Sequence, residues 1–285
     1  MRKQKIYNFA NYKLSSELKC DVGKISLNSD LTTASLFKEK LDCKTVFSNR
    51  EDMIVCGEAF ILRFVKERFP SLICLSNYKD GDFVKKGSKL IQLSGDIRWI
   101  LFLERTLLNF LQHLSSISTY TNKFVKKLNG TKTVLLDTRK TTNGLRILEK
   151  YATKIGGAKN HRMGLYDKIL IKDNHIKVIG GISKTLSLIK KQRIKKFEIE
   201  CETFEEVKKC INYNCRHILL DNMSIKEIKK CLSLRKETGK KILFEVSGGV
   251  NLDNIKQYSK LGVDYISTSK ITNSVKSVDI GLDII

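Results

Sequence analysis

The chain has little proline, no long apolar run and no signal-peptide core. Its single proline, Pro70, and its abundant lysine, asparagine and isoleucine indicate compositional drift. The longest apolar stretches, such as Trp99–Leu103, are far shorter than the roughly 20 residues that cross a bilayer. Residues 6–13 do not form the apolar core of a signal peptide. We therefore expect a cytoplasmic protein outside the membrane.

The cysteines form no metal-binding or redox motif. The sequence has eight of them but no Cys-x-x-Cys pair, and none has a histidine at zinc-finger spacing. We predict reduced thiols that behave as small apolar residues.

The balance of charge is strongly basic, with 53 Lys and Arg against 30 Asp and Glu and a formal net charge of +23. The lysines are spread along the whole chain and form no basic stripe with interleaved aromatics. No helix-turn-helix, RNA-recognition or zinc-finger pattern is present. The sequence thus argues against a nucleic-acid function without giving a reason for the charge.

The first hundred residues predict a small sheet with one or two helices. Short apolar segments at 53–55, 72–75 and 89–93 lie among turn signals, and 59–69 has helical spacing. A long helical pattern follows over 104–128. No repeat or low-complexity linker marks a boundary, so the change of pattern near residue 100 is the best indication of one.

The rest of the chain alternates between strand-like and helix-like segments, which predicts a parallel α/β domain. Six strands are expected, at 134–137, 169–172, 197–200, 217–221, 242–246 and 264–268. Polar residues end each strand: Asp137-Thr138-Arg139-Lys140, Lys172-Asp173-Asn174, Glu200, Asp221-Asn222, Ser247-Gly248 and Ser267-Thr268-Ser269. In a barrel all these positions converge at one mouth, whereas an open sheet needs them only at its switch point. A barrel is therefore favoured.

The residues expected at this mouth combine many cations with a few acids. The cations are Arg139, Lys140, His161, Arg162 and Lys172, and the acids are Glu200 and Asp221. Guanidinium groups bind planar carboxylates and phosphates bidentately, and lysine adds a compact charge. Paired acids suit Mg²⁺ with substrate phosphate oxygens. The predicted ligand is polyanionic and metal-bound.

A glycine loop, Ser247-Gly248-Gly249, follows the fifth of these strands and opens a helix. Glycine permits close approach of the backbone, and a helix N-terminus favours an anion. This position is near the place where barrels commonly bind phosphate. The loop is therefore a candidate phosphate site.

Several stretches, in this order and spacing, resemble the quinolinate phosphoribosyltransferase family. The resemblance begins at Ser29-Asp30-Leu31-Thr32-Thr33 and extends to the C-terminus. Its most specific segments are 104–111, 137–142, 160–167, 171–175, 219–223 and 247–249. It implies an N-terminal α/β sandwich over 1–104, joined by the tail 273–285, and an incomplete parallel α/β barrel over 105–272. It also implies a homodimer whose active sites lie at the subunit interface.

The resemblance also implies a role for each site residue. Arg139, His161, Arg162 and Lys172 would bind the carboxylates of quinolinate, and Arg105 would reach in from the partner subunit. Lys140 would face phosphoribosyl pyrophosphate, Glu200 and Asp221 would bind the ribose hydroxyls and Mg²⁺, and Ser247 with Gly248 would bind the 5′-phosphate. Thr138, Gly249 and Ser269 are further residues expected to bind substrate. The implied enzyme is a pentosyltransferase, nicotinate-nucleotide diphosphorylase (carboxylating). It would form nicotinate mononucleotide, pyrophosphate and CO₂ for NAD biosynthesis, with Lys140, Lys172, Glu200 and Asp221 as catalytic residues.

Two departures from the family pattern lie near the C-terminus. Thr268-Ser269 replaces the usual Val-Gly, and Asn273 replaces a histidine. We expect the Ser269 hydroxyl to donate to a phosphate oxygen, because serine is small and can supply a donor where glycine has none. The remaining histidines, His113, His175 and His217, are interpreted as structural, with His175 ordering the loop after Lys172.

Two alternatives stay open. One is a related phosphoribosyltransferase that acts on another pyridine carboxylate, such as nicotinate, without decarboxylation. The other is a basic protein that binds RNA, which a strongly salt-dependent RNA affinity without quinolinate turnover would indicate.

Overall fold

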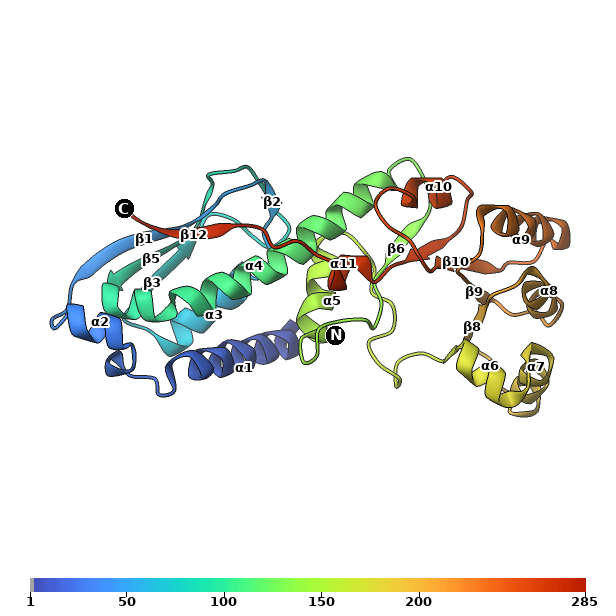
Figure 1. The fold of residues 1–285 in the computed structure, drawn as a ribbon, viewed down its shortest axis with the longest axis horizontal. Coiled ribbons are helices and arrows are strands. Elements are labelled where there is room, and N and C mark those ends of the chain that lie inside the picture. The colour runs from blue at the N-terminus through green and yellow to red at the C-terminus, as the bar shows by residue number, and fades with distance from the viewer. Residues whose placement is uncertain (1–2) are drawn as a thin grey trace. The chain divides into compact units, whose positions relative to one another are not determined.

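A computed structural model describes residues 3–285 and divides the chain into two compact units (Figure 1). Unit 1 comprises residues 1–122, 142–157 and 275–285, and unit 2 comprises residues 123–141 and 158–274. The domain boundary expected near residue 104 stays a prediction. Over the described residues, every helix is too short or too polar to span a membrane.

Unit 1 is built on an antiparallel sheet whose strand order is β12-β1-β5-β3. These strands are β12 (Ile280–Ile284), β1 (Asp42–Asn49), β5 (Lys89–Asp96) and β3 (Ile73–Ser76), and a separate ladder joins β2 (Met53–Ile54) to β4 (Phe83–Val84). The helices of the unit are α1 (Lys3–Val22), α2 (Leu31–Leu36), α3 (Glu58–Arg68) and α5 (Arg146–Ile155), with a 3-10 turn at Leu27–Ser29. Leu14 of α1, Phe64 of α3 and Phe47 of β1 share one buried core. Helices therefore cover the sheet, as an α/β sandwich requires.

The long helix α4 (Ile97–Lys127) begins in unit 1 and ends in unit 2. Its leucines recur at helical spacing, and Leu103, Leu107 and Leu111 are fully buried. The sequence pattern predicted this helix from residue 104, and the structure starts it seven residues earlier.

Unit 2 contains six parallel strands in the order β6-β11-β10-β9-β8-β7. The strands are β6 (Val134–Leu136), β7 (Leu170–Ile171), β8 (Glu198–Cys201), β9 (His217–Asp221), β10 (Leu243–Ser247) and β11 (Tyr265–Ser267). The helices between them are α6 (Asp173–Ile179), α7 (Ile182–Lys191), α8 (Phe204–Asn212), α9 (Ile225–Thr238), α10 (Ile255–Ser259) and α11 (Lys270–Asn273). Among the described strands β6 and β7 are edges that do not pair with each other, so the barrel is incomplete. The α/β class predicted from the sequence is confirmed.

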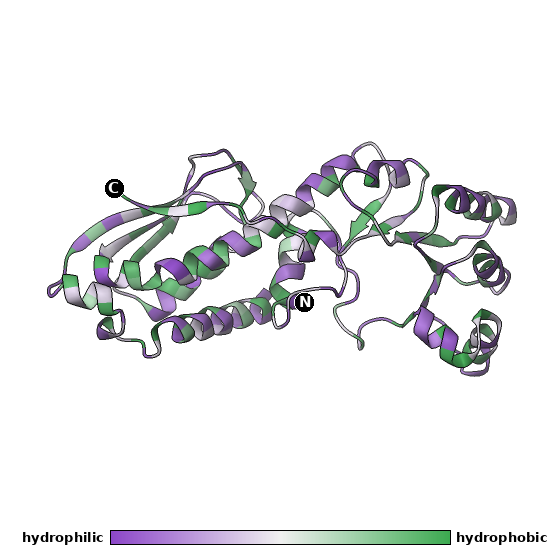
Figure 2. Cartoon of the chain, viewed as in Figure 1, coloured by the Kyte–Doolittle hydropathy of each residue, from purple (hydrophilic) through white to green (hydrophobic). Residues whose placement is uncertain are grey.

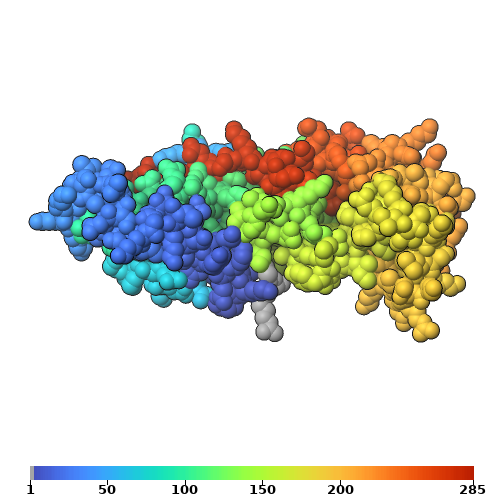
Figure 3. All heavy atoms as spheres, turned by 60° about the horizontal axis from the view of Figure 1, so that its bottom comes forward, coloured from blue at the N-terminus to red at the C-terminus, as the bar shows by residue number. Residues whose placement is uncertain are grey.

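Local sequence explains how these elements begin and which face they bury. Thr203 and Glu206 form a capping box at the start of α8, and Ser224 and Glu227 form another at the start of α9. Helices of both units carry hydrophobic and hydrophilic residues side by side, as amphipathic helices do (Figure 2). Helices α6 and α7, drawn in yellow, lie on the surface of unit 2 in the space-filling view (Figure 3). In the ribbon view, helices α6, α7, α8 and α9 lie on one side of strands β8, β9 and β10 (Figure 1).

Candidate active site

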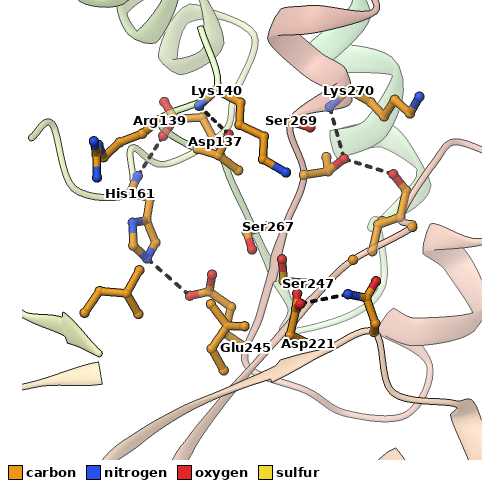
Figure 4. Close-up of a pocket in the computed structure, with 18 of the residues that line it drawn as sticks. Asp137, Arg139, Lys140, His161, Asp221, Glu245, Ser247, Ser267, Ser269 and Lys270 are labelled. Atoms are coloured by element: carbon orange, nitrogen blue, oxygen red, sulfur yellow. Dashed lines mark hydrogen bonds and ion pairs between the residues drawn. The ribbon is translucent and has the colours of Figure 1, made fainter. Parts of the chain in front are cut away.

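A cavity of about 360 Å³ lies at the carboxyl ends of the unit 2 strands (Figure 4). Its size is in the range of small-molecule sites. Most of the predicted site residues line it: Thr138, Arg139, Lys140, His161, Arg162, Lys172, Asp221, Ser247, Gly248, Gly249 and Ser269. Five of the six strand ends expected to converge at one mouth contribute to it, whereas the end of β8, with Glu200, does not line the cavity. All of the lining residues belong to unit 2.

Two arginines give the cavity its anion-binding character. Arg139 follows β6, and Arg162 is only 7% exposed. Within the described residues, the buried Nε atoms of both guanidinium groups lack a hydrogen-bond partner. Burial lowers the pKa of Arg162, and the neighbouring charge of Arg139 lowers it further. Arg162 is buried, Arg139 is half-buried, and a buried Nε donor without a partner is costly unless an anion satisfies it, so this part of the cavity is suited to carboxylates.

Lys172, directly after β7, forms an ion pair with Glu200 near the end of β8. Lys172 Nζ lies 2.8 Å from Glu200 Oε2. Lys172 lines the cavity, whereas Glu200 is not among the lining residues and is 5% exposed. The backbone N–H of Lys172 donates to His175 Nδ1 at 3.0 Å, so His175 orders this turn.

The glycine loop after β10 packs closely against the end of β9. Asn222 Nδ2 donates to Asp221 Oδ2 at 2.7 Å (Figure 4). Gly248 has a φ of +87°, and a Cβ there would collide with the Asn222 side chain and lie 2.8 Å from its backbone nitrogen. Gly249 has a φ of +62° but open space around it. Gly248 is therefore required by sterics as well as by its backbone conformation.

Two of the three residues that depart from the family pattern, Ser269 and Asn273, contact each other. Asn273 Nδ2 donates to Ser269 Oγ at 3.3 Å. Ser269 has a φ of −83°, so its backbone does not need glycine. Because Asn273 uses the oxygen of Ser269 as an acceptor, the hydroxyl proton remains available for a ligand.

Three charged lining residues were not singled out from the sequence as site residues: Asp137, Glu245 and Lys270. Asp137 is fully buried and accepts hydrogen bonds from Asn160 Nδ2 at 2.6 Å and from the backbone N–H of His161 at 2.8 Å. It thereby fixes the start of the loop that carries His161. Its position at a strand end was the signal that could have identified it.

Glu198, on β8, lies behind His161 and is fully buried. Burial raises its pKa, but the hydrogen bonds from His161 and Lys168 outweigh burial and hold the pKa below its usual range. Glu198 is therefore ionised at neutral pH.

Arg105 is exposed on α4 and belongs to unit 1. Its expected role in the active site of a partner subunit stays a prediction.

Comparisons with known proteins are consistent across both units. The chain matches the C-terminal domain of quinolinate phosphoribosyl transferase over residues 117–283 and the N-terminal domain over residues 30–115. It is 40% identical over 280 residues to a protein of Methanocaldococcus jannaschii named "Probable nicotinate-nucleotide pyrophosphorylase (carboxylating)", a match that covers 95% of this chain and 96% of that one.

Solved structures give the same result. A nicotinate-nucleotide pyrophosphorylase from Francisella tularensis superposes with a TM-score of 0.88 at 36% identity and covers 98% of this chain and 97% of its own. One from Ehrlichia chaffeensis has a TM-score of 0.88 at 37% identity, with 100% and 99% covered.

Proposed function

Because the chain belongs to the quinolinate phosphoribosyl transferase family, we propose that it transfers the phosphoribosyl group of phosphoribosyl pyrophosphate to quinolinate with decarboxylation. The products are nicotinate mononucleotide, pyrophosphate and CO₂, in a step of NAD biosynthesis. The observation that carries the proposal is the pair of guanidinium groups of Arg139 and Arg162 at the cavity, whose buried Nε atoms are unpartnered within the described residues.

Quinolinate binds at the Arg139 end of the cavity in this proposal. Its two carboxylates accept hydrogen bonds from Arg139 and Arg162, and His161 and Lys172 add further donors. The lowered pKa of Arg162 supports this arrangement, because the cause is burial beside a second cation, which an anionic ligand relieves. The ring nitrogen is thereby directed toward the sugar.

The phosphoribosyl group binds at the glycine loop. The loop from Ser247 to Gly249 opens toward the cavity, and its glycines let a phosphate approach the backbone. Ser269 adds a hydroxyl donor, and Lys140 extends toward the cavity from the end of β6 (Figure 4). Lys140 then offsets negative charge on the departing pyrophosphate.

The donor set fits Mg²⁺ in part. Asp221 lines the cavity with a carboxylate, and Mg²⁺ is bound by one or two carboxylates together with substrate phosphate oxygens. Glu200 is held by Lys172, so it becomes available only when Lys172 turns to a substrate carboxylate. When bound, Mg²⁺ would supply charge stabilisation to the pyrophosphate.

The residues act mainly by alignment and fixed charge. Positioning the pyridine nitrogen against the ribose C1 makes the step effectively unimolecular. As pyrophosphate leaves, the sugar becomes oxocarbenium-like, and the carboxylates of Asp221 and Glu200 stabilise the cationic sugar. After the carbon–nitrogen bond forms, the quaternary nitrogen stabilises the electron pair that remains on the ring carbon when CO₂ departs, and that carbon then takes up a proton from water to give nicotinate mononucleotide. No covalent nucleophile is needed.

The proposal includes a cytosolic homodimer in which Arg105 enters the active site of the partner subunit. This arrangement accounts for an exposed arginine on α4 that makes no ion pair in the described part of the chain.

Formation of nicotinate mononucleotide from quinolinate and phosphoribosyl pyrophosphate, with release of CO₂, tests the proposal. Turnover of nicotinate without CO₂ would indicate the related transferase instead. RNA binding without any turnover would contradict both.

A further inference from the structure

Two buried carboxylates beside the cavity face two histidine rings. His161 Nε2 lies 3.2 Å from Glu198 Oε2 and 3.8 Å from Glu245 Oε2, and the second contact is drawn in Figure 4. His217 Nε2 lies 3.4 Å from Glu245 Oε2 and 3.7 Å from Glu198 Oε1. Both carboxylates are fully buried. The positions of the protons on both histidine rings therefore depend on these two carboxylates.

Lys168 determines the proton position on His217. Its Nζ lies 2.7 Å from Glu198 Oε2 and 3.3 Å from His217 Nδ1. An ammonium group can only donate, so His217 Nδ1 accepts this hydrogen bond and carries no proton. The ring proton is then on Nε2, toward the carboxylates, and His217 is neutral.

Glu245 lacks a positively charged partner unless His161 is protonated. Lys168 contributes a positive charge at Glu198, and Arg162 also acts electrostatically on Glu198, whereas in the described part of the chain Glu245 lies in ion-pair range of His161 and His217 alone. Among the described residues, neither oxygen of Glu245 accepts a hydrogen bond. A buried carboxylate without compensation is strongly unfavourable, and His161 is the remaining group that contacts both acids and can carry a positive charge.

The second nitrogen of His161 is the one available to a ligand. His161 lines the cavity, and its Nδ1 makes no hydrogen bond to any residue of the described range. A neutral ring with its proton on Nε2 would present a lone pair to an anionic substrate. A doubly protonated ring presents a donor instead.

We propose that Glu245, together with Glu198, is a positioning residue that keeps His161 a double donor, with Nε2–H held by the carboxylates and Nδ1–H presented to a carboxylate of the substrate. The inference rests on the proposed function for the identity of that substrate. Glu245 acts through His161, so its removal should weaken the binding of quinolinate and leave the binding of phosphoribosyl pyrophosphate unchanged.

A metal ion is the competing occupant, because ligand atoms of His161, Glu198 and Glu245 all lie within 4.8 Å of one another. The ammonium group of Lys168 argues against it. Lys168 already neutralises Glu198 at 2.7 Å and would repel a divalent cation at the same carboxylate.

The ¹⁵N spectrum of the free enzyme tests the inference without any substrate. In protein labelled with ¹⁵N-histidine at neutral pH, with His161 assigned through His161→Gln, both ring nitrogens of His161 should show the protonated signature. A neutral His161 ring would overturn the inference, and so would a stoichiometric metal ion that is present in the wild type and lost in Glu245→Gln. Because the spectrum is recorded on the wild type without substrate, it still reports whether His161 is doubly protonated if Glu245→Gln fails to fold or if the wild type is inactive on quinolinate.

Kinetics supply the second test. Glu245→Gln keeps the shape but not the charge, so the KM for quinolinate should rise by about fivefold to tenfold, as expected for one weakened charge-assisted contact. The KM for phosphoribosyl pyrophosphate should stay within about twofold. Glu245→Asp, which keeps the charge, should recover part of the quinolinate affinity.

The matched control is Glu58→Gln in unit 1. Glu58 is also buried, and burial together with the nearby Asp80 raises its pKa to about 7, so this exchange removes only part of a negative charge at neutral pH. It should leave both KM values unchanged. An active Glu245→Gln enzyme whose KM for quinolinate equals that of the wild type would reject the inference while leaving the proposed function intact.

Discussion

Arg139 and Arg162 make the clearest prediction at the scale of single residues. Replacement of either by alanine should raise the KM for quinolinate about tenfold or more, because a charge-assisted contact in a desolvated site is worth roughly 1.5–3 kcal/mol. The KM for phosphoribosyl pyrophosphate should change far less. Steady-state kinetics with each substrate varied in turn measures the difference.

The matched control for the arginines is Arg50→Ala. Arg50 lies in unit 1, where its exposed side chain forms an ion pair with Asp283 at 2.6 Å. Its replacement should therefore change the KM for neither substrate. An equal loss of affinity for both substrates in Arg139→Ala or Arg162→Ala would count against the assignment of these residues to the carboxylates.

Ser269 gives a second prediction at this scale. Ser269→Gly should weaken the binding of phosphoribosyl pyrophosphate by roughly 1 kcal/mol, about fivefold in affinity, since one hydrogen bond is lost. Asn273→Ala should have a smaller effect, because Asn273 only orients the hydroxyl through its 3.3 Å contact. Quinolinate affinity should be nearly unchanged in both variants. Tighter binding of the phosphorylated substrate by Ser269→Gly would show that the serine is an obstruction.

The loop after β10 makes the prediction at the scale of elements. Gly248→Ala and Gly249→Ala both force a side chain into a positive φ, which costs roughly 1–2 kcal/mol. Only Gly248→Ala also collides with Asn222, beside Asp221. We therefore expect a larger drop in melting temperature and a larger rise in the KM for phosphoribosyl pyrophosphate for Gly248→Ala. Equal effects in the two variants would show that the close packing against β9 is unimportant.

Much of unit 2 could be predicted because each element is specified locally. Strand β9 was predicted with its observed bounds, His217–Asp221, since an apolar run ends there at an acid and a turn. The capping box of Ser224 and Glu227 likewise explains why helix α9 starts at Ile225. Polar residues at the strand ends also indicated the cavity, because parallel strands bring such positions together.

Long-range pairing and buried charge could not be predicted in the same way. Strand β12 pairs with β1 across more than 230 residues, as in Thr45 with Ile284, and nothing local in either segment indicates the partner. Helix α1 was missed because its apolar residues are few among polar ones. Glu198 and Glu245 lie inside apolar strands, and only the fold brings them to His161.

At the scale of the whole molecule, the proposed substrates do not explain the high net positive charge. Lysines at the ends of helices, such as Lys190 and Lys191 of α7, are exposed at a helix C-terminus, where cations are stabilised by the helix dipole. The cavity accounts for only a few of the cations. The proposed function therefore does not depend on the net charge.

The proposed dimer makes a prediction at this scale as well. If Arg105 enters the site of the partner subunit, mixing inactive Arg105→Ala chains with inactive Lys172→Ala chains should restore part of the activity. Some hybrid sites would then contain both intact residues. The absence of recovery after subunit exchange has been confirmed would reject a shared site.

The central claim is that the cavity of unit 2 binds quinolinate through Arg139 and Arg162 and converts it with phosphoribosyl pyrophosphate. The most direct measurement uses quinolinate labelled with ¹⁴C in its 2-carboxylate and follows release of labelled CO₂ together with nicotinate mononucleotide. Equal amounts of both products are predicted for the wild type, with much less of both for Arg139→Ala at the same quinolinate concentration. Absence of both products from the folded wild-type protein would contradict the account.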